Sequence, residues 1–270
     1  MSSIKKIKNI KNLKRKIVCL TAYSKPLAKI LDKYCDIILM GDSVATAFYG
    51  MKNTREIKLD TMINHAISVR KSIKKSLLVF DMPFNTYRNL KEAKKNVKKV
   101  ILKTNCDAIK LESNGKNFKI LKTLVNSGIK VMGHIGYTPQ YKKYFSPQGL
   151  KYNEEIKLIK EAKNIEKAGA FAIVLECVNM DLAKKITKNL HIPTIGIGSS
   201  KYCDGQILVL DDLIGLSGFY PKFVKKYINL EKILNKVIKK YRNDVIRNNF
   251  PKISNAYKLK WTLTHQKITL

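Results

Sequence analysis

Long hydrophobic runs and the common nucleotide-binding glycine motifs are both missing from this sequence of 270 residues. No apolar stretch approaches the roughly 20 residues that a membrane-spanning helix needs, so we expect no membrane partner. Neither G-x-G-x-x-G nor G-x-x-x-x-G-K-[S/T] occurs, which disfavours a dinucleotide-binding fold and a P-loop nucleotidase. With 45% hydrophobic residues, the chain still has enough apolar side chains for one large domain or two small ones.

Cysteine is scarce, and its spacing matches no disulfide or zinc-binding pattern. The five cysteines are an odd number without a C-x-x-C spacing, which argues against a disulfide framework and against a zinc ribbon. Cys19, Cys106 and Cys177 lie in or beside apolar runs. We therefore expect buried, reduced thiols, as in a cytoplasmic protein.

Acidic residues are also few, since 20 Asp and Glu stand against 53 Lys and Arg, for a net charge of +33. A nucleic-acid-binding protein is one interpretation of such a charge. However, 47 of the basic residues are lysine and only 6 are arginine, the side chain that nucleic-acid readers favour. The lysines are spread over every segment, as in proteins of A/T-rich genomes. We expect no nucleic-acid partner and keep that interpretation as the alternative from another class.

Short apolar runs alternate with lysine-rich segments of helical period along most of the chain. This alternation predicts one α/β domain over residues 1–270, a closed (β/α)8 barrel. An N-terminal helix at about 3–14 and a helical C-terminal extension at about 221–250 complete it. Asn179 or Asp181 is the expected N-cap of one helix. The expected strands are 17–22, 36–40, 77–80, 108–111, 130–133, 171–175, 193–197 and 206–210, and the expected helices between them are 60–75, 90–104, 118–127, 154–168 and 180–190.

Several of the scarce acids directly follow predicted strands. Asp42, Asp81, Glu112 and Glu176 each come after an apolar run, and His134 comes after another. In a parallel barrel these positions share one rim, at the carboxyl ends of the strands, where active sites are built. Taken singly, each residue has a simpler explanation. The aspartates could cap helices, Glu112 could be an ordinary loop acid, and the histidine could be structural.

Taken together, these acids predict a metal site. Three carboxylates on one rim repel one another unless a cation lies among them, and hard oxygen ligands favour Mg²⁺. Lys110 precedes Glu112 by two residues, so both side chains point the same way from a strand. A lysine beside a metal suits an anionic substrate such as a keto acid. Glu176 is then the candidate base for a proton next to a polarised carbonyl.

Seven motifs occur in order: TAY (21–23), MGDSVATAFYG (40–50), FDMPF (80–84), AIKLES (108–113), VMGHIGYTPQ (131–140), VLEC (174–177) and IPTIGIGSSKYCDGQILVLDD (192–212). Together they resemble the 3-methyl-2-oxobutanoate (ketopantoate) hydroxymethyltransferase family over roughly residues 5–250. The resemblance implies a barrel of the phosphoenolpyruvate/pyruvate-like superfamily. It also implies transfer of a hydroxymethyl group from 5,10-methylenetetrahydrofolate to 3-methyl-2-oxobutanoate, giving 2-dehydropantoate in the pantothenate pathway.

The resemblance further implies a cofactor, an assembly and a set of residue roles. The cofactor is one Mg²⁺ per subunit, and the assembly is a cytoplasmic homo-oligomer, typically a decamer. The implied metal-site residues are Asp42, Asp81 and Glu112, the keto acid is bound by Asp42, Ser43, Asp81, Lys110 and His134, and Glu176 is the catalytic base.

The sequence departs from the family pattern away from these residues. Ser24 replaces the usual Asp after T-A-Y, and the glycine-rich loop at 144–150 keeps Gln148 and Gly149 but lacks its Arg. I-G-A-G becomes IGSS at 197–200, and the C-terminal motif is reduced to SNAY at 254–257. We expect these changes to affect folate binding, loop closure and assembly. Another metal-dependent carbon–carbon lyase of the same superfamily, or a decayed enzyme, remains as an alternative.

Overall fold

Eight parallel strands close into a barrel in the computed structural model, which describes residues 3–13, 15–218 and 220–257. The strands follow one another around the barrel in chain order, and β8 pairs with β1 to close it. The predicted fold class is therefore confirmed. The strands are β1 (Ile17–Thr21), β2 (Ile37–Met40), β3 (Leu77–Asp81), β4 (Ala108–Glu112), β5 (Val131–Gly136), β6 (Ala172–Glu176), β7 (Thr194–Ile197) and β8 (Gly205–Leu208).

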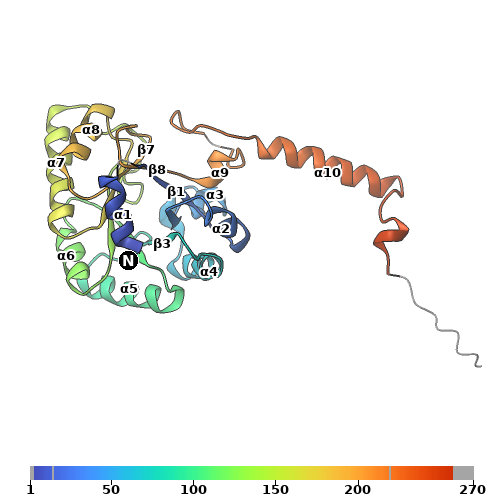
Figure 1. Cartoon of the computed structure of the whole chain (residues 1–270), viewed down its shortest axis with the longest axis horizontal. Coiled ribbons are helices and arrows are strands. Elements are labelled where there is room, and N and C mark those ends of the chain that lie inside the picture. The colour runs from blue at the N-terminus through green and yellow to red at the C-terminus, as the bar shows by residue number, and fades with distance from the viewer. Residues whose placement is uncertain (1–2, 14, 219, 258–270) are drawn as a thin grey trace, which may run out of the picture. The chain divides into compact units, whose positions relative to one another are not determined.

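Helices connect most of the strands, and α4 to α8 surround the barrel (Figure 1). The Asn179 side chain accepts hydrogen bonds from the N–H groups of Asp181 and Leu182, which confirms it as an N-cap. The helices are α1 (Ser3–Asn12), α2 (Lys25–Leu31), α3 (Val44–Ala47), η1 (Thr54–Glu56), α4 (Leu59–Arg70), α5 (Leu90–Thr104), α6 (Phe118–Asn126), α7 (Tyr152–Lys167), α8 (Met180–Asn189), α9 (Leu210–Leu213), α10 (Leu230–Ile246) and η2 (Ile253–Asn255).

Some boundaries differ from the sequence prediction. Strand β5 continues to Gly136, so His134 lies inside a strand and not after one. The C-terminal helix begins at Leu230 and not near 221, because Pro221 opens a turn and the Tyr227 N–H bonds to the Leu213 carbonyl. The expected end of the first helix at residue 14 lies outside the described residues.

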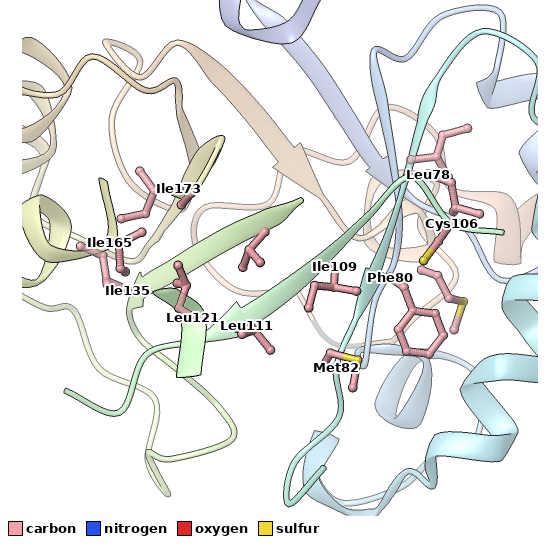
Figure 2. Close-up of a cluster of buried hydrophobic side chains, with 14 of the residues drawn as sticks. Leu78, Phe80, Met82, Cys106, Ile109, Leu111, Leu121, Ile135, Ile165 and Ile173 are labelled. Carbon is pink, nitrogen blue, oxygen red and sulfur yellow. The ribbon is translucent and has the colours of Figure 1, made fainter. Parts of the chain in front are cut away.

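Two layers of apolar side chains explain why the predicted strands are continuous apolar runs. Strands β2 to β5 are buried along their whole length, because one face fills the barrel and the other packs on helices. Figure 2 shows part of the outer layer, where Ile135 and Ile173 lie near Ile165 of α7. The inner layer is a separate cluster that includes Leu77, Val79 and Met132. Alternate residues of each strand therefore point into the barrel.

Helix α1 packs at the amino-terminal end of the barrel. Its Ile7 and Ile10 are buried in the inner cluster with residues such as Ile17 of β1. The ammonium of Lys11 donates to the Ile192 carbonyl before β7 and to Asp204 before β8. The helix predicted at the N-terminus is thus an integral part of the barrel.

Four aspartates at this same end, the amino-end acids, hold the strands together. Each accepts hydrogen bonds from backbone N–H groups at or next to the start of a strand, and three also pair with a cation. They are Asp32, bonded by Lys74, Lys75 and Ser76; Asp36, by Val18 and Arg15; Asp107, by Leu78 and Arg70; and Asp204, by Thr194 and Lys11. These acids are structural.

The chain folds into two compact units, Met1–Tyr227 and Ile228–Leu270. The first unit contains the whole barrel. In the second, none of the 17 described residues of α10 is buried, and apolar side chains such as Val237, Ile238 and Tyr241 are exposed. The single domain over residues 1–270 stays a prediction, and 258–270 lie outside the described residues. Within the described part of the chain, no helix has the length and apolarity to cross a membrane.

Candidate active site

All seven residues singled out from the sequence line one cavity of about 580 Å³. The cavity lies at the carboxyl ends of the strands, as the barrel argument predicts. Its lining includes the predicted set of Asp42, Ser43, Asp81, Lys110, Glu112, His134 and Glu176.

The strands place these side chains by their inward alternation. Asp81 and Glu176 are the last residues of β3 and β6, two positions beyond the inward-facing Val79 and Val174. Glu112 ends β4, two positions beyond Lys110. The strand register sets Lys110 opposite Asp81 and His134 opposite Glu112. The short polar ends of four neighbouring strands therefore converge above the apolar interior of the barrel.

Lys110 and Asp81 form the closest ion pair of the site. The Lys110 ammonium lies 2.9 and 2.8 Å from the two oxygens of Asp81 and 4.0 Å from Glu112 Oε1. Both side chains of the pair are at least 95% buried, and such a pair is kept only where each charge has partners. The prediction that Lys110 and Glu112 share one side of the strand is confirmed by this geometry.

Gln140 links the site together, although its motif alone gave it no role. Its side-chain amide donates to Asp42 Oδ2 at 2.8 Å and to the Met82 carbonyl at 3.0 Å, and its backbone N–H donates to Glu112 Oε2 at 3.0 Å. The Tyr87 hydroxyl donates to the Gln140 amide oxygen at 2.5 Å. Gln140 ends the T-P-Q motif, and nothing in the motif itself indicates that this residue bonds to two acids of the site.

The helix-capping explanation of the aspartates is wrong in this structure. Asp42 points to Gln140 and lies beside Asp81, whose Oδ2 accepts the Asp42 backbone N–H at 3.5 Å. Helix α5 after β3 is capped by Asn89 instead. The hydroxyl of Ser43, the next residue, lies 2.8 Å from the Tyr23 hydroxyl and lines the cavity.

Burial of so many acids changes their protonation. Burial raises the carboxyl pKa of Asp42 to about 6 and that of Asp81 to about 7, although the Lys110 charge works in the opposite direction. For Lys110, burial lowers the pKa but the surrounding carboxylates of Asp81 and Glu112 outweigh it, so the ammonium pKa is raised. Lys110 therefore stays charged, and the site still contains more carboxylates than one lysine can pair.

His134 lies between two carboxylates. Its Nδ1 is 3.4 Å from Glu112 Oε1 and its Nε2 is 3.2 Å from Glu176 Oε2, although neither contact has the alignment of a hydrogen bond. Burial and Lys110 lower the imidazole pKa, but these two carboxylates raise it to about 9. The ring is thus cationic at neutral pH and holds Glu112 and Glu176 on either side of it.

The donor chemistry of the site fits a hard divalent cation. Glu112 Oε1 is buried without a hydrogen bond, and the neighbouring Asp42 and Asp81 have raised pKa values, so added positive charge would be favourable. As they are placed, no three Asp, Glu, His or Cys side chains of the described residues are grouped to hold a metal. The Lys110 ammonium lies on both oxygens of Asp81, so a metal ligand there would first have to turn away from it.

His65 and the five cysteines have structural surroundings. His65 Nδ1 lies 2.7 Å from the Tyr23 carbonyl and its Nε2 lies 2.9 Å from the Tyr49 hydroxyl. All five cysteines are buried and free. Among the departures from the family pattern, Ser24 occupies the N-cap position of α2 without a side-chain cap, and Ser200 is buried.

Comparisons with known proteins show which family the chain belongs to. A sequence model described as ketopantoate hydroxymethyltransferase matches residues 1–253. The chain belongs to the ketopantoate hydroxymethyltransferase family. A relative in this family, the 3-methyl-2-oxobutanoate hydroxymethyltransferase of Pelagibacter ubique, is 51% identical over 255 residues, which are 94% of this chain and 99% of the relative. The enzyme of the same name from Bartonella tribocorum is 45% identical over 90% of this chain and 92% of its own.

Solved structures extend the fold comparison beyond the ketopantoate hydroxymethyltransferase family. A phosphonopyruvate hydrolase in complex with oxalate and Mg²⁺ aligns with a TM-score of 0.61 at 12% identity, over 94% of this chain and 93% of that one. A 2,3-dimethylmalate lyase of the PEP mutase/isocitrate lyase superfamily aligns with a TM-score of 0.60 at 11% identity, over 97% and 92%. At these identities the likeness shows the barrel fold alone.

Proposed function

We propose that the chain catalyses the transfer of a hydroxymethyl group from 5,10-methylenetetrahydrofolate to 3-methyl-2-oxobutanoate. The products are 2-dehydropantoate and tetrahydrofolate, and water supplies the oxygen of the new hydroxyl. The observation that carries the proposal is the convergence of all seven candidate residues on one cavity. Family membership supports the same reaction.

The keto acid is held by groups that match its charge. The buried ammonium of Lys110 binds its carboxylate, the Ser43 hydroxyl donates a hydrogen bond to it, and His134 lines the pocket beside it. The cavity floor is closed by buried side chains, so these interactions act where water screens them little.

Mg²⁺ is the metal that the donor set suits, and Asp42, Asp81 and Glu112 are the residues that would hold it. When bound, Mg²⁺ supplies Lewis acidity that favours loss of a proton next to the keto group. Gln140 keeps two of these ligands in place through its bonds to Asp42 and Glu112.

Glu176 is the base in this proposal. Its side chain is 17% exposed, more open to the cavity than the 1% exposed Glu112, and it ends a strand whose backbone fixes it. The Glu176 carboxylate takes the proton from C3 of the keto acid. The electron pair left on that carbon forms the new bond to the one-carbon unit. Both bonds between the one-carbon unit and the folate nitrogens break, water supplies the hydroxyl, and the two nitrogens take up the proton from C3 and one proton of the water. His134 Nε2 lies 3.2 Å from Glu176 Oε2, so the imidazole stands directly beside the base.

Assembly and location are also proposed. Exposed apolar side chains of α10, among them Val237, Ile238 and Tyr241, support association of copies, and a decamer is the size expected from the family. Light scattering of the purified protein measures that size. We place the enzyme in the cytoplasm with its small-molecule substrates and without a nucleic-acid partner.

A product assay tests the proposed reaction. Purified protein is mixed with 3-methyl-2-oxobutanoate, 5,10-methylenetetrahydrofolate and Mg²⁺, and 2-dehydropantoate is measured by mass spectrometry. We expect product in this mixture and its loss when a chelator replaces the metal. Folded protein that forms no product with all components present would contradict the proposal.

A further inference from the structure

Three aromatic side chains form one side of the cavity above the buried acids. We call Tyr137, Phe145 and Phe223 the aromatic wall, and all three line the cavity. The rings of Tyr137 and Phe145 meet edge to face with centroids 5.2 Å apart, and Phe145 and Phe223 are stacked at 6.4 Å. The three residues come from two loops of the chain more than 70 positions apart, so the wall exists only in the folded barrel.

The wall begins at the proposed base. The Tyr137 N–H donates to the Glu176 backbone carbonyl at 2.8 Å, so the residue with the first ring of the wall is bonded through its backbone to the residue that removes the proton. The last ring is seated on Gly198, which has a φ of +56° and where a Cβ would lie 2.6 Å from the Phe223 ring. A continuous aromatic surface therefore runs from the reacting centre outward, and more than half of Phe145 is exposed.

Cations stand at the open end of the same cavity. We call Lys52, Arg55 and Lys143 the cationic lip, because they line the cavity and are at least partly exposed, unlike the buried floor. Among the described residues, the Arg55 guanidinium has no hydrogen bond or ion pair. Burial raises the pKa of the Tyr137 hydroxyl, and the positive charge of Arg55 opposes that rise. Arg55 therefore lies near the wall. Lys142 is already occupied, since its ammonium donates to the carbonyl of Gly136 and to Gln148.

We propose that the aromatic wall binds the ring system of the folate co-substrate and that the cationic lip binds the carboxylates of its glutamate tail. The inference rests on the proposed function, since it assigns the second substrate of that reaction. A one-carbon unit carried next to a flat ring must reach the carbon from which Glu176 takes the proton, and Tyr137 borders that place. Aromatic faces suit such a ring, and unpaired cations suit a polyanionic tail.

This assignment also accounts for the altered loop at 144–150. The family's arginine is absent there, but Lys143 directly before the loop and Arg55, which also lines the cavity, supply positive charge. Phe145 of the loop supplies the central ring of the wall. The loop has therefore kept the chemistry that a folate needs while changing its residues.

Phe145→Ala tests the wall, with Tyr34→Ala as the control. Tyr34 is an exposed aromatic residue that precedes β2 and does not line the cavity. We expect Phe145→Ala to raise KM for 5,10-methylenetetrahydrofolate about tenfold, Phe145→Leu to do nearly the same and Phe145→Tyr to restore it. Tyr34→Ala should leave that KM unchanged. An unchanged KM in Phe145→Ala would overturn the assignment of the wall.

Exchange of the C3 proton of the keto acid in heavy water, measured without folate, separates this inference from the proposed function. We expect wild-type exchange in Phe145→Ala, because the wall does not touch the keto acid. If wild-type protein forms product but Phe145→Ala loses exchange, Phe145 serves the keto-acid site and the inference is wrong. If the wild type itself neither exchanges nor forms product, the proposed function has failed instead.

A series of folates of different tail charge tests the lip. The methylene derivatives of tetrahydropteroate, its monoglutamate and its triglutamate carry the same rings and increasing negative charge. We expect Arg55→Ala and Lys143→Ala to raise KM severalfold for the triglutamate and to leave KM for the pteroate unchanged. Lys58 is an exposed cation outside the cavity lining, so the control Lys58→Ala should change neither KM. Equal effects on all three folates, or none, would overturn the assignment of the lip.

Discussion

The two ends of the barrel use the same scarce residue type in opposite ways. At the amino-terminal end, Asp32, Asp36, Asp107 and Asp204 each accept backbone N–H groups, and three of them also pair with a cation. At the carboxyl-terminal end the acids face one another around Lys110 and His134, with raised pKa values at Asp42 and Asp81.

The difference teaches how to separate structural acids from functional ones. An acid whose carboxylate accepts backbone N–H groups at a strand start stabilises the fold. An acid held near other acids costs folding free energy, and it is retained where a cation or a proton has to be bound. Position relative to the strand distinguishes the two groups, because the amino-end acids precede strands and the site acids end or follow them.

The largest expected effect is at the carboxyl-terminal end. Glu176→Gln removes the base but preserves the size of the side chain, so kcat for product formation should fall by about 10²–10⁴. KM for the keto acid should change little, because Lys110 and Ser43 remain. Steady-state kinetics measure both, and a kcat within twofold of the wild type would exclude Glu176 as the base.

The matching change at the amino-terminal end should affect stability and not catalysis. Burial works to raise the Asp32 pKa, but bonds from the N–H groups of Ser76, Lys75 and Lys74 outweigh it and lower that pKa. Asp32→Asn should cost about 1–3 kcal/mol of unfolding free energy at neutral pH, seen in urea titrations, with kcat unchanged.

The Asp32 effect has a defined pH dependence. A carboxyl whose folded pKa is lowered contributes stability above its unfolded pKa, near 4, and loses it as the pH falls through the folded value. The difference between wild type and Asp32→Asn should therefore shrink in acid. A constant difference down to about pH 2 would show that the charge of Asp32 is not what holds the backbone.

Asp42→Asn should raise the unfolding free energy of the metal-free protein, whereas Asp32→Asn lowers it. The folded pKa of Asp42 is raised to about 6, so the folded protein holds this proton more tightly than the unfolded chain does. Its ionisation therefore costs stability that grows as the pH rises from about 4 to 6 and then stays constant. At about pH 8 the Tm of the variant should be higher than that of the wild type, by roughly 2–4 °C for each kcal/mol of unfolding free energy gained. The variant should also be inactive. A lower Tm together with normal activity would contradict both the destabilising effect of the buried Asp42 carboxylate and its role in the metal site.

The smallest effect is expected on the outer helices, where most of the lysines lie. Replacing Lys91 and Lys95 on the exposed side of α5 with Gln should change the unfolding free energy by no more than about 0.5 kcal/mol each and leave kcat unchanged. A large loss of kcat/KM at low salt would show that this charge steers the anionic substrates.

The barrel and the floor of its site could be predicted from sequence for physical reasons. Parallel strands buried on both faces are continuous apolar runs, and a polar residue that ends such a run must lie at the rim. The two-residue spacing of Lys110 and Glu112 also fixes their shared direction on a strand.

Other features depended on contacts between distant segments. Gln140 bridges Asp42 and Glu112 from a loop after β5, and no local pattern distinguishes it from an ordinary loop amide. The rings of Phe145 and Phe223 meet only through the folded chain. The sequence analysis did not identify the amino-end acids as structural, because their role is visible only in the backbone N–H groups that they bind.

Exchange of the C3 proton of 3-methyl-2-oxobutanoate in heavy water tests the central claim most directly, because it requires only the floor of the site. NMR follows loss of the C3–H signal with Mg²⁺ and without folate. We predict rapid exchange with the wild type, little with Glu176→Gln and wild-type exchange with Asp32→Asn. Equal exchange rates for wild type and Glu176→Gln would contradict the assignment of the chemistry to this end of the barrel.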